Sequence, residues 1–473
     1  MKHYSYLACA AASVALLAGC NGSSGGGGGG KAPERHVFAA SNGIDGSQLW
    51  ITDGTSDGTK MVKNIAGNSD ANPHGFTRFG DAWFFTAQDN SGDVELWKTD
   101  GTDAGTVLVK DINAADSSYP HNFTAMGDAL YFFATDQDGQ SLFKTQGTEA
   151  TTVRVIDSAL LGITQFSTEL IRYGDKLFFA ARTNSEGEEL WSTDGSHDGT
   201  QRLADIAVGT AGSHPGDLTV AGDTLFFSAR DNQSRRGLWK MTEQATAPEL
   251  INNTEVSNAS NPQYLTAVGD QLFFAANGAR GVELYVSNGE ASGTRLVKDI
   301  SAPAGIQLQT ASEPSSFPRD LYQHNGTLYF AATTAADGAE LWKSDGTEAG
   351  TVMVKSIASA AGDSNPHLMF SAGTQMLFVA RDDTSDSLWV TDGTEAGTQL
   401  MKNFTENNSD SEVISLGRMQ YQHGETLMVN GSALLAADGV AGAELWKTDG
   451  TTAGTTLVKD INEGPGDSLR TVN

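Results

Sequence analysis

Short apolar segments recur along the chain from residue 36 onwards, and runs rich in Gly, Asp, Asn, Ser and Thr separate them. One stretch shows four in succession, at residues 74–80, 82–87, 95–100 and 106–112. The second of these, AWFFTA, is apolar without alternation, which predicts a strand buried on both faces. The fourth alternates apolar and polar residues more regularly, which predicts an outer strand. The body of the chain contains no long amphipathic-helix pattern.

One aromatic position repeats nine times with a period of 46 to 57 residues. It is occupied by Trp50, Trp97, Phe143, Trp191, Trp239, Tyr285, Trp342, Trp389 and Trp446. A period in the forties, with four short strands in each unit, is typical of β-propeller blades. The sequence therefore predicts an all-β propeller of nine blades. Eight blades are the alternative, because the unit around Trp239 and the inserts near 301–316 and 404–440 are irregular.

The two ends of the repeat region complement each other. The first unit begins at residues 36–41, whose apolar pattern already matches a second strand, and the last ten residues, 464–473, look like the start of a first strand. Joining them would complete one unit. We therefore predict a ring closed by strands from both ends of the chain, which removes an exposed sheet edge.

The recurring segment ELWKTDGT predicts structure rather than chemistry. Asp followed by Gly is turn chemistry, because the carboxylate accepts bonds from backbone N–H groups and Gly allows a positive φ. A catalytic residue would not be needed once in every blade. The tryptophans are expected to form large apolar wedges between blades. The turn position is filled by Asp53, Asp100, Asp194, Asp345, Asp392 and Asp449, with Gln146 and Asn288 replacing it twice.

The N-terminus carries a pattern of its own. A short polar start is followed by an apolar run and then by LAGC at residues 17–20. This resembles the bacterial lipoprotein signal, which implies cleavage after residue 19 and a lipid on Cys20. The absence of Asp at residue 21 resembles the default signal for the outer membrane. We expect a signal peptide (1–19), a lipidated Gly/Ser-rich tether (20–33) and a propeller (34–473).

The net charge and the cysteine content limit the kinds of partner and cross-link that we expect. The formal net charge is −28, which argues against nucleic acid or anionic lipid as a ligand and suits solubility or cation binding. Only two cysteines are present, at positions 9 and 20, so we expect no disulfide in the mature chain. A monomer is favoured.

The repeat ELWKTDGTDAGTVLVKDI at residues 95–112 resembles the bacterial ELWxxDGT repeat proteins. The resemblance covers nearly the whole body, while the units SLFKTQGT, GLWKMTEQ and ELYVSNGE depart from the pattern. It implies a repeat type and no particular biochemical activity.

Two groups of residues are candidates for binding. His74, His121, Arg319 and His367 each follow a proline just before the predicted first strand of a blade, where they could ring the mouth of a central channel and hold an anion, a sugar or a transition metal. Asp89, Ser91, Asp93 and Glu95 alternate along one loop, as oxygen ligands of calcium do, without matching a full calcium-binding loop. Turns with solvated side chains are the alternative for both groups, and otherwise no cofactor is expected.

No G-x-S-x-G, H-E-x-x-H or phosphate-binding loop is present. The sequence favours a lipid-anchored envelope propeller that acts as a non-catalytic binding or adhesion module for protein or glycan partners. A scaffold for envelope assembly facing the periplasm, and a hydrolase acting at the channel mouth, are the alternatives.

Overall fold

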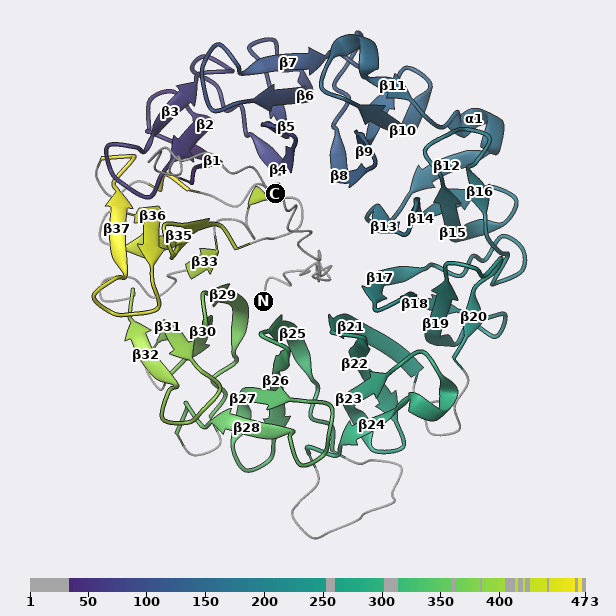
Figure 1. The fold of residues 1–473 in the computed structure, drawn as a ribbon, viewed down its shortest axis with the longest axis vertical. Helices are drawn as coiled ribbons and strands as arrows, with labels where there is room; N and C mark the ends of the chain where they lie inside the picture. Colours follow the sequence, from purple (N-terminus) through teal and green to yellow (C-terminus); the bar gives the residue numbers. More distant parts are fainter. Residues whose placement is uncertain are drawn as a thin grey trace, which may run out of the picture.

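The structure is a computed structural model that describes residues 34–251, 260–301, 314–359, 362–382, 385–404, 413–415, 420–421, 426–439, 442–463 and 467–469. In this part of the chain, 37 strands form nine antiparallel sheets arranged as a ring (Figure 1). The predicted all-β propeller is confirmed, with nine blades rather than eight. None of the described helices is long and apolar enough to cross a membrane.

We number the blades 1 to 9 in chain order, and each runs from the centre of the ring to its perimeter (Figure 1). The inner strands are β4 (His74–Phe79), β8 (His121–Met126), β12 (Ile163–Phe166) with β13 (Ile171–Tyr173), β17 (Gly216–Ala221), β21 (Ser260–Val268), β25 (Arg319–His324), β29 (His367–Ala372), and β33 (Val413–Ser415) with β34 (Met428–Val429). The second strands are β1 (His36–Ser41), β5 (Ala82–Gln88), β9 (Ala129–Asp136), β14 (Lys176–Thr183), β18 (Thr224–Arg230), β22 (Gln271–Gly278), β26 (Thr327–Thr334), β30 (Gln375–Arg381) and β35 (Ser432–Gly439).

The third strands are β2 (Ser47–Thr52), β6 (Val94–Thr99), β10 (Gly139–Thr145), β15 (Gly187–Thr193), β19 (Arg236–Thr242), β23 (Gly281–Ser287), β27 (Gly338–Ser344), β31 (Asp386–Thr391) and β36 (Gly442–Thr448). The outer strands are β3 (Lys60–Lys63), β7 (Val107–Lys110), β11 (Val153–Arg154), β16 (Gln201–Arg202), β20 (Glu249–Leu250), β24 (Arg295–Lys298), β28 (Val352–Lys355), β32 (Gln399–Lys402) and β37 (Thr456–Lys459). The described helices are α1 (Ser158–Leu161), η1 (Glu149–Thr151) and η2 (Ala291–Gly293).

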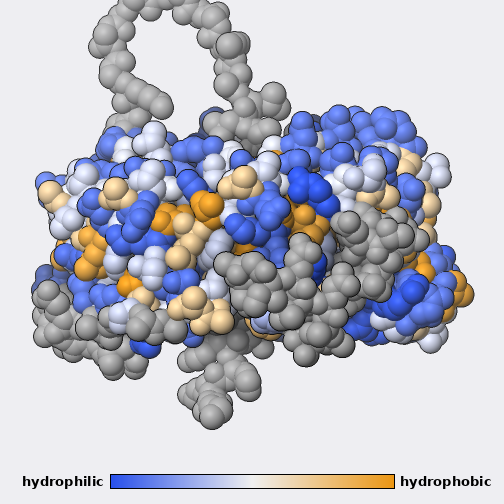
Figure 2. All heavy atoms as spheres, turned by 90° about the horizontal axis from the view of Figure 1, so that it is seen from below, coloured by the Kyte–Doolittle hydropathy of each residue, from blue (hydrophilic) through white to orange (hydrophobic). Residues whose placement is uncertain are grey.

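The hydrophobic cores lie between blades. Trp97 of blade 2 is buried in one cluster with Val37, Leu49 and Ile51 of blade 1. Trp191 of blade 4 is likewise buried against side chains of blade 3, including Phe133. Both tryptophans are therefore wedges between blades. Because each sheet is covered on both faces, the second strands are apolar without alternation. Seen from the side, apolar residues are scattered among hydrophilic ones on the coloured surface (Figure 2).

The Asp-Gly turns join the third and outer strands. The Asp100 carboxylate accepts hydrogen bonds from the backbone N–H of Thr102 at 2.9 Å and from its hydroxyl at 2.7 Å. These bonds to Thr102 lower the pKa of Asp100. Gly101 has a φ of +90°, and a Cβ at Gly105 would lie 2.0 Å from the Asp100 carboxylate. The turn thus requires both glycines, for different reasons.

Lysines tie neighbouring blades together at these turns. Lys98 donates to the carbonyl of Gly147 in the turn of the next blade at 2.7 Å. Lys110, on the outer strand, donates to the carbonyl of Thr152 in the same neighbouring blade at 2.9 Å. The same two contacts join blade 9 to blade 1, from Lys447 to Gly54 and from Lys459 to Thr59. The ring is therefore closed by the contacts that join its other blades.

Blade 1 contains three strands among the described residues, where the sequence predicted four. The Ser468 carbonyl accepts from Ser41 N–H at 2.8 Å, as the Ser118 carbonyl accepts from Thr135 between blades 2 and 3. Residues 467–469 thus lead towards the place that an inner strand of blade 1 would occupy. The predicted closing strand beyond Leu469 lies outside the described residues.

Candidate functional site

The inner strands face the centre of the ring (Figure 1), so the loops before them form one rim around its axis. We call the X-Pro-X loops at residues 72–76, 119–123, 213–218, 261–265, 317–321 and 365–370 the inner rim. Residues on both sides of each proline have positive φ, for example Asn72 at 43° and Gly75 at 67°. The register also shifts between His74 and Thr77, which marks a bulge at the start of β4.

Several bulky residues of the inner rim share this strained conformation. Tyr119 has a φ of 48° and Phe317 a φ of 46°, and the two residues are 58% and 57% exposed. Tyr264 and Leu368 also have positive φ, at 57° and 51°. Such residues are rare outside glycine and collect at functional sites. The inner rim is therefore a candidate position for a binding or catalytic group.

Each predicted rim histidine contacts the backbone of its own loop. Nδ1 of His74, His121 and His367 each lies 2.8 Å from the carbonyl of the residue before its own proline. Burial lowers the pKa of His121, and the nearby His74 lowers it further. His74 and His121 are therefore neighbours in adjacent blades.

Arg319 lies elsewhere on the rim, where it donates to the Asn365 side chain at 2.7 Å, beside the loop of His367. The four predicted residues thus form two neighbouring pairs, and the structure does not bring them to one point. Their role in binding stays a prediction.

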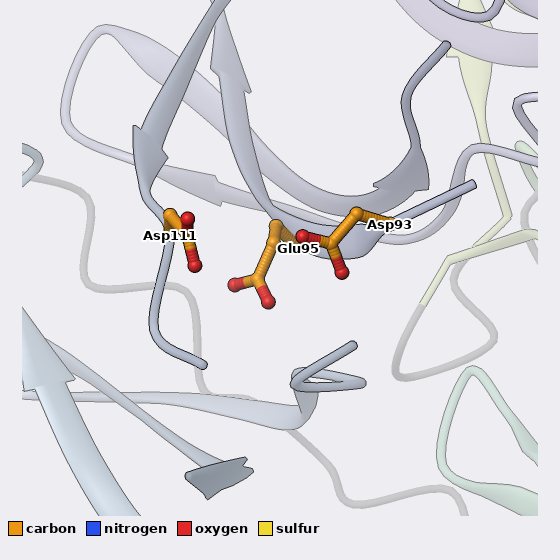
Figure 3. A group of neighbouring side chains, drawn as sticks. All are labelled: Asp93, Glu95 and Asp111. Atoms are coloured by element: carbon orange, nitrogen blue, oxygen red, sulfur yellow. The ribbon is translucent and has the colours of Figure 1, made fainter. Parts of the chain in front are cut away.

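The predicted calcium ligands have two different roles in the structure. Asp89 caps its own turn, since its carboxylate accepts from Ser91 N–H at 2.7 Å and from the Ser91 hydroxyl at 2.6 Å. Glu95 instead points into the blade. It joins Asp93 and Asp111, and ligand oxygens of these three residues lie within 4.8 Å of one another (Figure 3). This trio is the arrangement that could hold a cation, and calcium binding stays a prediction.

Glu95 belongs to a set of buried glutamates that the sequence analysis did not single out. Its carboxylate accepts from Ile112 N–H at 2.9 Å, Ser118 N–H at 2.9 Å and the Ser118 hydroxyl at 2.6 Å, so it holds the connection to the next blade. The equivalent carboxylates hold the same connection in four other blades. They belong to Glu189, Glu283, Glu340 and Glu444, all 0% exposed.

Burial raises the pKa of Glu95, Glu283 and Glu444 to about 7, against the lowering effect of the serine hydrogen bonds. In blade 1 an amide replaces the acid: Gln48 accepts from Ile65 N–H and donates to the carbonyl of Ser69. A polar residue within an otherwise apolar third strand, followed by a serine 23 or 24 residues later, or 33 residues later for Glu283, was the sequence signal for this set.

A group of five polar residues from blades 4 and 5 gathers at the inner-rim loop of blade 5. We call Glu188, His214, Asp217, Ser228 and Arg236 the β17 cluster. Nδ1 of His214 lies 3.1 Å from the Glu188 carboxylate, and the two side chains are 33% and 15% exposed. Because a carboxylate can only accept, Nδ1 carries the hydrogen. The other ring nitrogen, Nε2, then has a lone pair that can take a proton from water.

Arg236 connects the remaining members of the β17 cluster. It donates to the His214 carbonyl at 3.0 Å and to the Ser228 hydroxyl at 2.7 Å. That hydroxyl lies 3.4 Å from the Asp217 carboxylate. Burial raises the pKa of Asp217 against the opposing charge of Arg236, and burial lowers the pKa of Arg236. A base, a carboxylic acid and a cation are thus linked at one point of the inner rim.

A second serine–histidine pair has a structural explanation. His324 Nδ1 lies 2.8 Å from the Ser371 hydroxyl, and its Nε2 lies 3.1 Å from the Thr374 carbonyl in the next blade. Tyr173, at the end of β13, bonds the Asp223 carbonyl of its neighbouring blade in the same way at 2.6 Å. His324 is only 5% exposed. We therefore interpret this pair as a tie between blades.

No family model matches the chain, and no curated protein matches it in sequence. Among solved structures, oligopeptidase B from Leishmania major is 14% identical with a TM-score of 0.42, over 74% of this chain and 49% of that one. A puromycin-hydrolyzing peptidase from Mycobacterium tuberculosis is 9% identical with a TM-score of 0.40, over 78% of this chain and 58% of that one. This chain thus spans about half the length of the structures it matches.

These comparisons contradict the prediction of a non-catalytic adhesion module, because the similar structures are peptidases and hydrolases. We do not retain that prediction. At such low identity the likeness concerns the fold alone, so any reaction has to be argued from the residues of this chain. The sequence alone did not reveal the β17 cluster, because its members lie on four strands and one loop.

Proposed function

We propose that this protein is a hydrolase whose centre is the β17 cluster on the inner rim. The observation that carries the proposal is the contact between His214 and Glu188, next to Asp217 and Arg236. In this proposal His214 Nε2 removes a proton from water, which attacks the scissile bond. Glu188 orients the imidazole and stabilises its charged form after proton transfer.

Asp217 is the proposed general acid. A carboxyl group whose pKa is raised by burial keeps its proton at higher pH and can donate it to the leaving group. Arg236 supplies a fixed positive charge where negative charge develops in the transition state. The side chain of Ser228 connects the acid to the cation and holds both in place.

The proposal is tested by assaying the purified protein on fluorogenic peptides, 4-nitrophenyl esters and fluorogenic glycosides. We expect turnover in one of these classes, and a loss of roughly 100-fold or more in His214→Ala. His367→Ala is the matched control, because that histidine sits on the same rim and contacts only its own turn in the described contacts. Absence of turnover in all three classes, or full activity of His214→Ala, would contradict the proposal.

The pH dependence of turnover tests the role of Asp217 as the general acid. Because Asp217 must be protonated to donate, turnover should fall as pH rises through its raised pKa. Asp217→Asn should abolish turnover at every pH and leave the melting temperature near that of the wild type. A variant that keeps the wild-type pH profile would exclude Asp217 as the acid.

The location is a separate proposal that rests on the sequence. We propose that Cys20 carries a lipid and that the propeller is held at the cell envelope, with the outer membrane favoured. Cys20 lies outside the described residues. Cys20→Ser should release the protein from the membrane fraction, and retention there would contradict lipid anchoring.

A further inference from the structure

Two aromatic rings are exposed on the inner rim, at the same position of two blades. Tyr119 lies in the loop of blade 3 and Phe317 in the loop of blade 7, and each comes directly before the proline of its loop. They are the two aromatic residues among the large apolar residues that the described chain exposes. In this part of the chain neither ring belongs to a hydrophobic core cluster. Both rings are therefore open to solvent.

The backbone places these rings where His214 lies in blade 5. The N–H groups of Tyr119 and Phe317 each bond the carbonyl of a valine at 3.2 Å, and the N–H of His214 bonds the Glu188 carbonyl at 3.1 Å. All three residues have a positive φ, between 46° and 48°. The two rings and the histidine of the β17 cluster thus occupy one repeated position of the inner rim.

Stability does not explain an aromatic residue at this position. A positive φ is unfavourable for a bulky side chain, and asparagine tolerates it better. An exposed ring also gains none of the free energy that burial provides. Three other loops place an exposed asparagine here with a positive φ, namely Asn72, Asn261 and Asn365. A ligand that covers the rings of Tyr119 and Phe317 would offset what these residues cost.

The two rings lie on either side of the β17 cluster. Their loops lead into β8 and β25, which are on opposite sides of the ring centre, and β17 is on the arc between them (Figure 1). Blade 4 separates Tyr119 from His214, and blade 6 separates His214 from Phe317. A whole blade thus lies between each ring and the histidine. A ligand that meets all three residues is therefore a chain of several units.

The chemistry of this position favours a neutral sugar chain. One face of a sugar ring presents C–H groups, which pack against the negative face of an aromatic ring. Asparagine side chains, which fill the position in other loops, can donate to and accept from sugar hydroxyls. A protein partner would instead need a contiguous apolar patch, whereas these rings are separated by polar loops. The net charge of −28 disfavours an acidic polymer.

We infer that Tyr119 and Phe317 are two platforms on which sugar rings stack, and that the ligand of the inner rim is a neutral glycan chain that spans them. This inference rests on the proposed function only for the claim that the chain is cleaved. In that case the bond cleaved at the β17 cluster is glycosidic. Water gives one proton to His214 and its oxygen bonds the anomeric carbon, while the leaving sugar oxygen takes the proton of Asp217. The two side chains then exchange a proton through solvent before the next cycle.

The test is a binding measurement that does not depend on turnover. Cellohexaose, maltohexaose, mannohexaose and chitohexaose are titrated into the full protein by calorimetry, each alongside its own disaccharide. We expect one hexasaccharide to bind roughly tenfold or more tightly than its disaccharide, because only the longer chain reaches both rings. Equal binding of long and short chains, or no binding of any of them, overturns the inference.

Asparagine is the matched replacement, because this chain uses it at the same position with the same sign of φ. Tyr119→Asn and Phe317→Asn should each weaken hexasaccharide binding roughly 3- to 10-fold, and the double variant should lose the preference for the longer chain. Tyr119→Phe is the control that keeps a ring, and it should keep the preference.

The melting temperature separates binding from packing. It should stay the same or rise in both asparagine variants, since asparagine tolerates the positive φ. Unchanged binding in the double variant, or a loss of binding that only follows a loss of stability, overturns the inference.

Peptides are the other polymer that the rings could meet. Binding of β-casein that the double variant loses, without binding of any hexasaccharide, would overturn the glycan as the ligand.

The two proposals fail separately. Length-dependent binding of a glycan without hydrolysis of any substrate class would overturn the proposed function and leave the platforms standing. Hydrolysis that depends on His214, without binding of any hexasaccharide, would do the reverse.

Discussion

Glu188 and Glu189 are adjacent on β15, and they point to opposite faces of the sheet. Glu189 is 0% exposed and anchors Ser213, whose hydroxyl donates to it at 2.6 Å. Glu188 is partly exposed and contacts the next residue, His214, at 3.1 Å. One glutamate therefore belongs to the repeated framework, and the other contacts a histidine of the inner rim. Residues that recur in many blades build the propeller, while residues that occur once form the proposed site.

Replacing an aromatic wedge between blades should destabilise the framework more than any other change considered below. Trp97→Ala should reduce the free energy of unfolding by about 3–5 kcal/mol, because it opens a cavity between blades 1 and 2. Urea unfolding measures this loss. Trp97→Phe is the control, since Phe143 fills the equivalent position in blade 3, and its loss should be clearly smaller. Equal losses in the two variants would show that the side chain does not act as a wedge.

The buried glutamates should make stability depend on pH. Glu283 has a pKa of about 7 when folded, above its ordinary value of 4.5, so the folded protein binds more protons in this window. Stability should therefore fall as pH rises from about 4.5 to 7, on the order of 1–3 kcal/mol for each such glutamate. Urea unfolding at pH 5 and pH 8 measures the difference. Glu283→Gln should remove its share, and an unchanged pH dependence would contradict the assignment.

The turn is tested by a pair of substitutions. Gly105→Ala places a Cβ against the Asp100 carboxylate, and Asp100→Ala removes that carboxylate together with its bonds to Thr102. Each should cost about 1 kcal/mol or somewhat more. The double variant should be more stable than the sum of the two losses implies, because the clash disappears. Additive losses would mean that Gly105 is required for another reason.

Much of the framework could be predicted from the sequence, because it rests on local chemistry. The Asp-Gly turn around Asp100 uses residues within five positions of one another, and the aromatic at Trp97 repeats with a visible period. The lysine contacts could not be predicted in the same way, since Lys98 bonds a carbonyl 49 residues away in the next blade. The role of Glu95 was hidden for the same reason, because its serine partner is 23 residues away.

The sequence predicted where the inner rim lies, but not which residues form the polar cluster on it. The prolines before the predicted first strands marked the rim, yet Glu188 and Arg236 reach the loop at residues 213–218 from two other strands. Only the fold brings these residues together. Spacing also suggested one ligand set from Asp89 to Glu95, whereas β6 begins only at Val94, so Glu95 lies inside the blade and Asp89 stays in its turn.

Glu188→Gln and Glu189→Gln, measured side by side, test the central comparison most directly. Turnover and melting temperature are recorded for both variants together with the wild type. Glu188→Gln should lower turnover by roughly tenfold or more at an unchanged melting temperature, because the amide no longer fixes the imidazole. Glu189→Gln should lower the melting temperature, because the amide cannot accept every bond that the carboxylate accepts. Full turnover in Glu188→Gln, or a turnover loss that only follows a loss of stability, would contradict the division between framework and site.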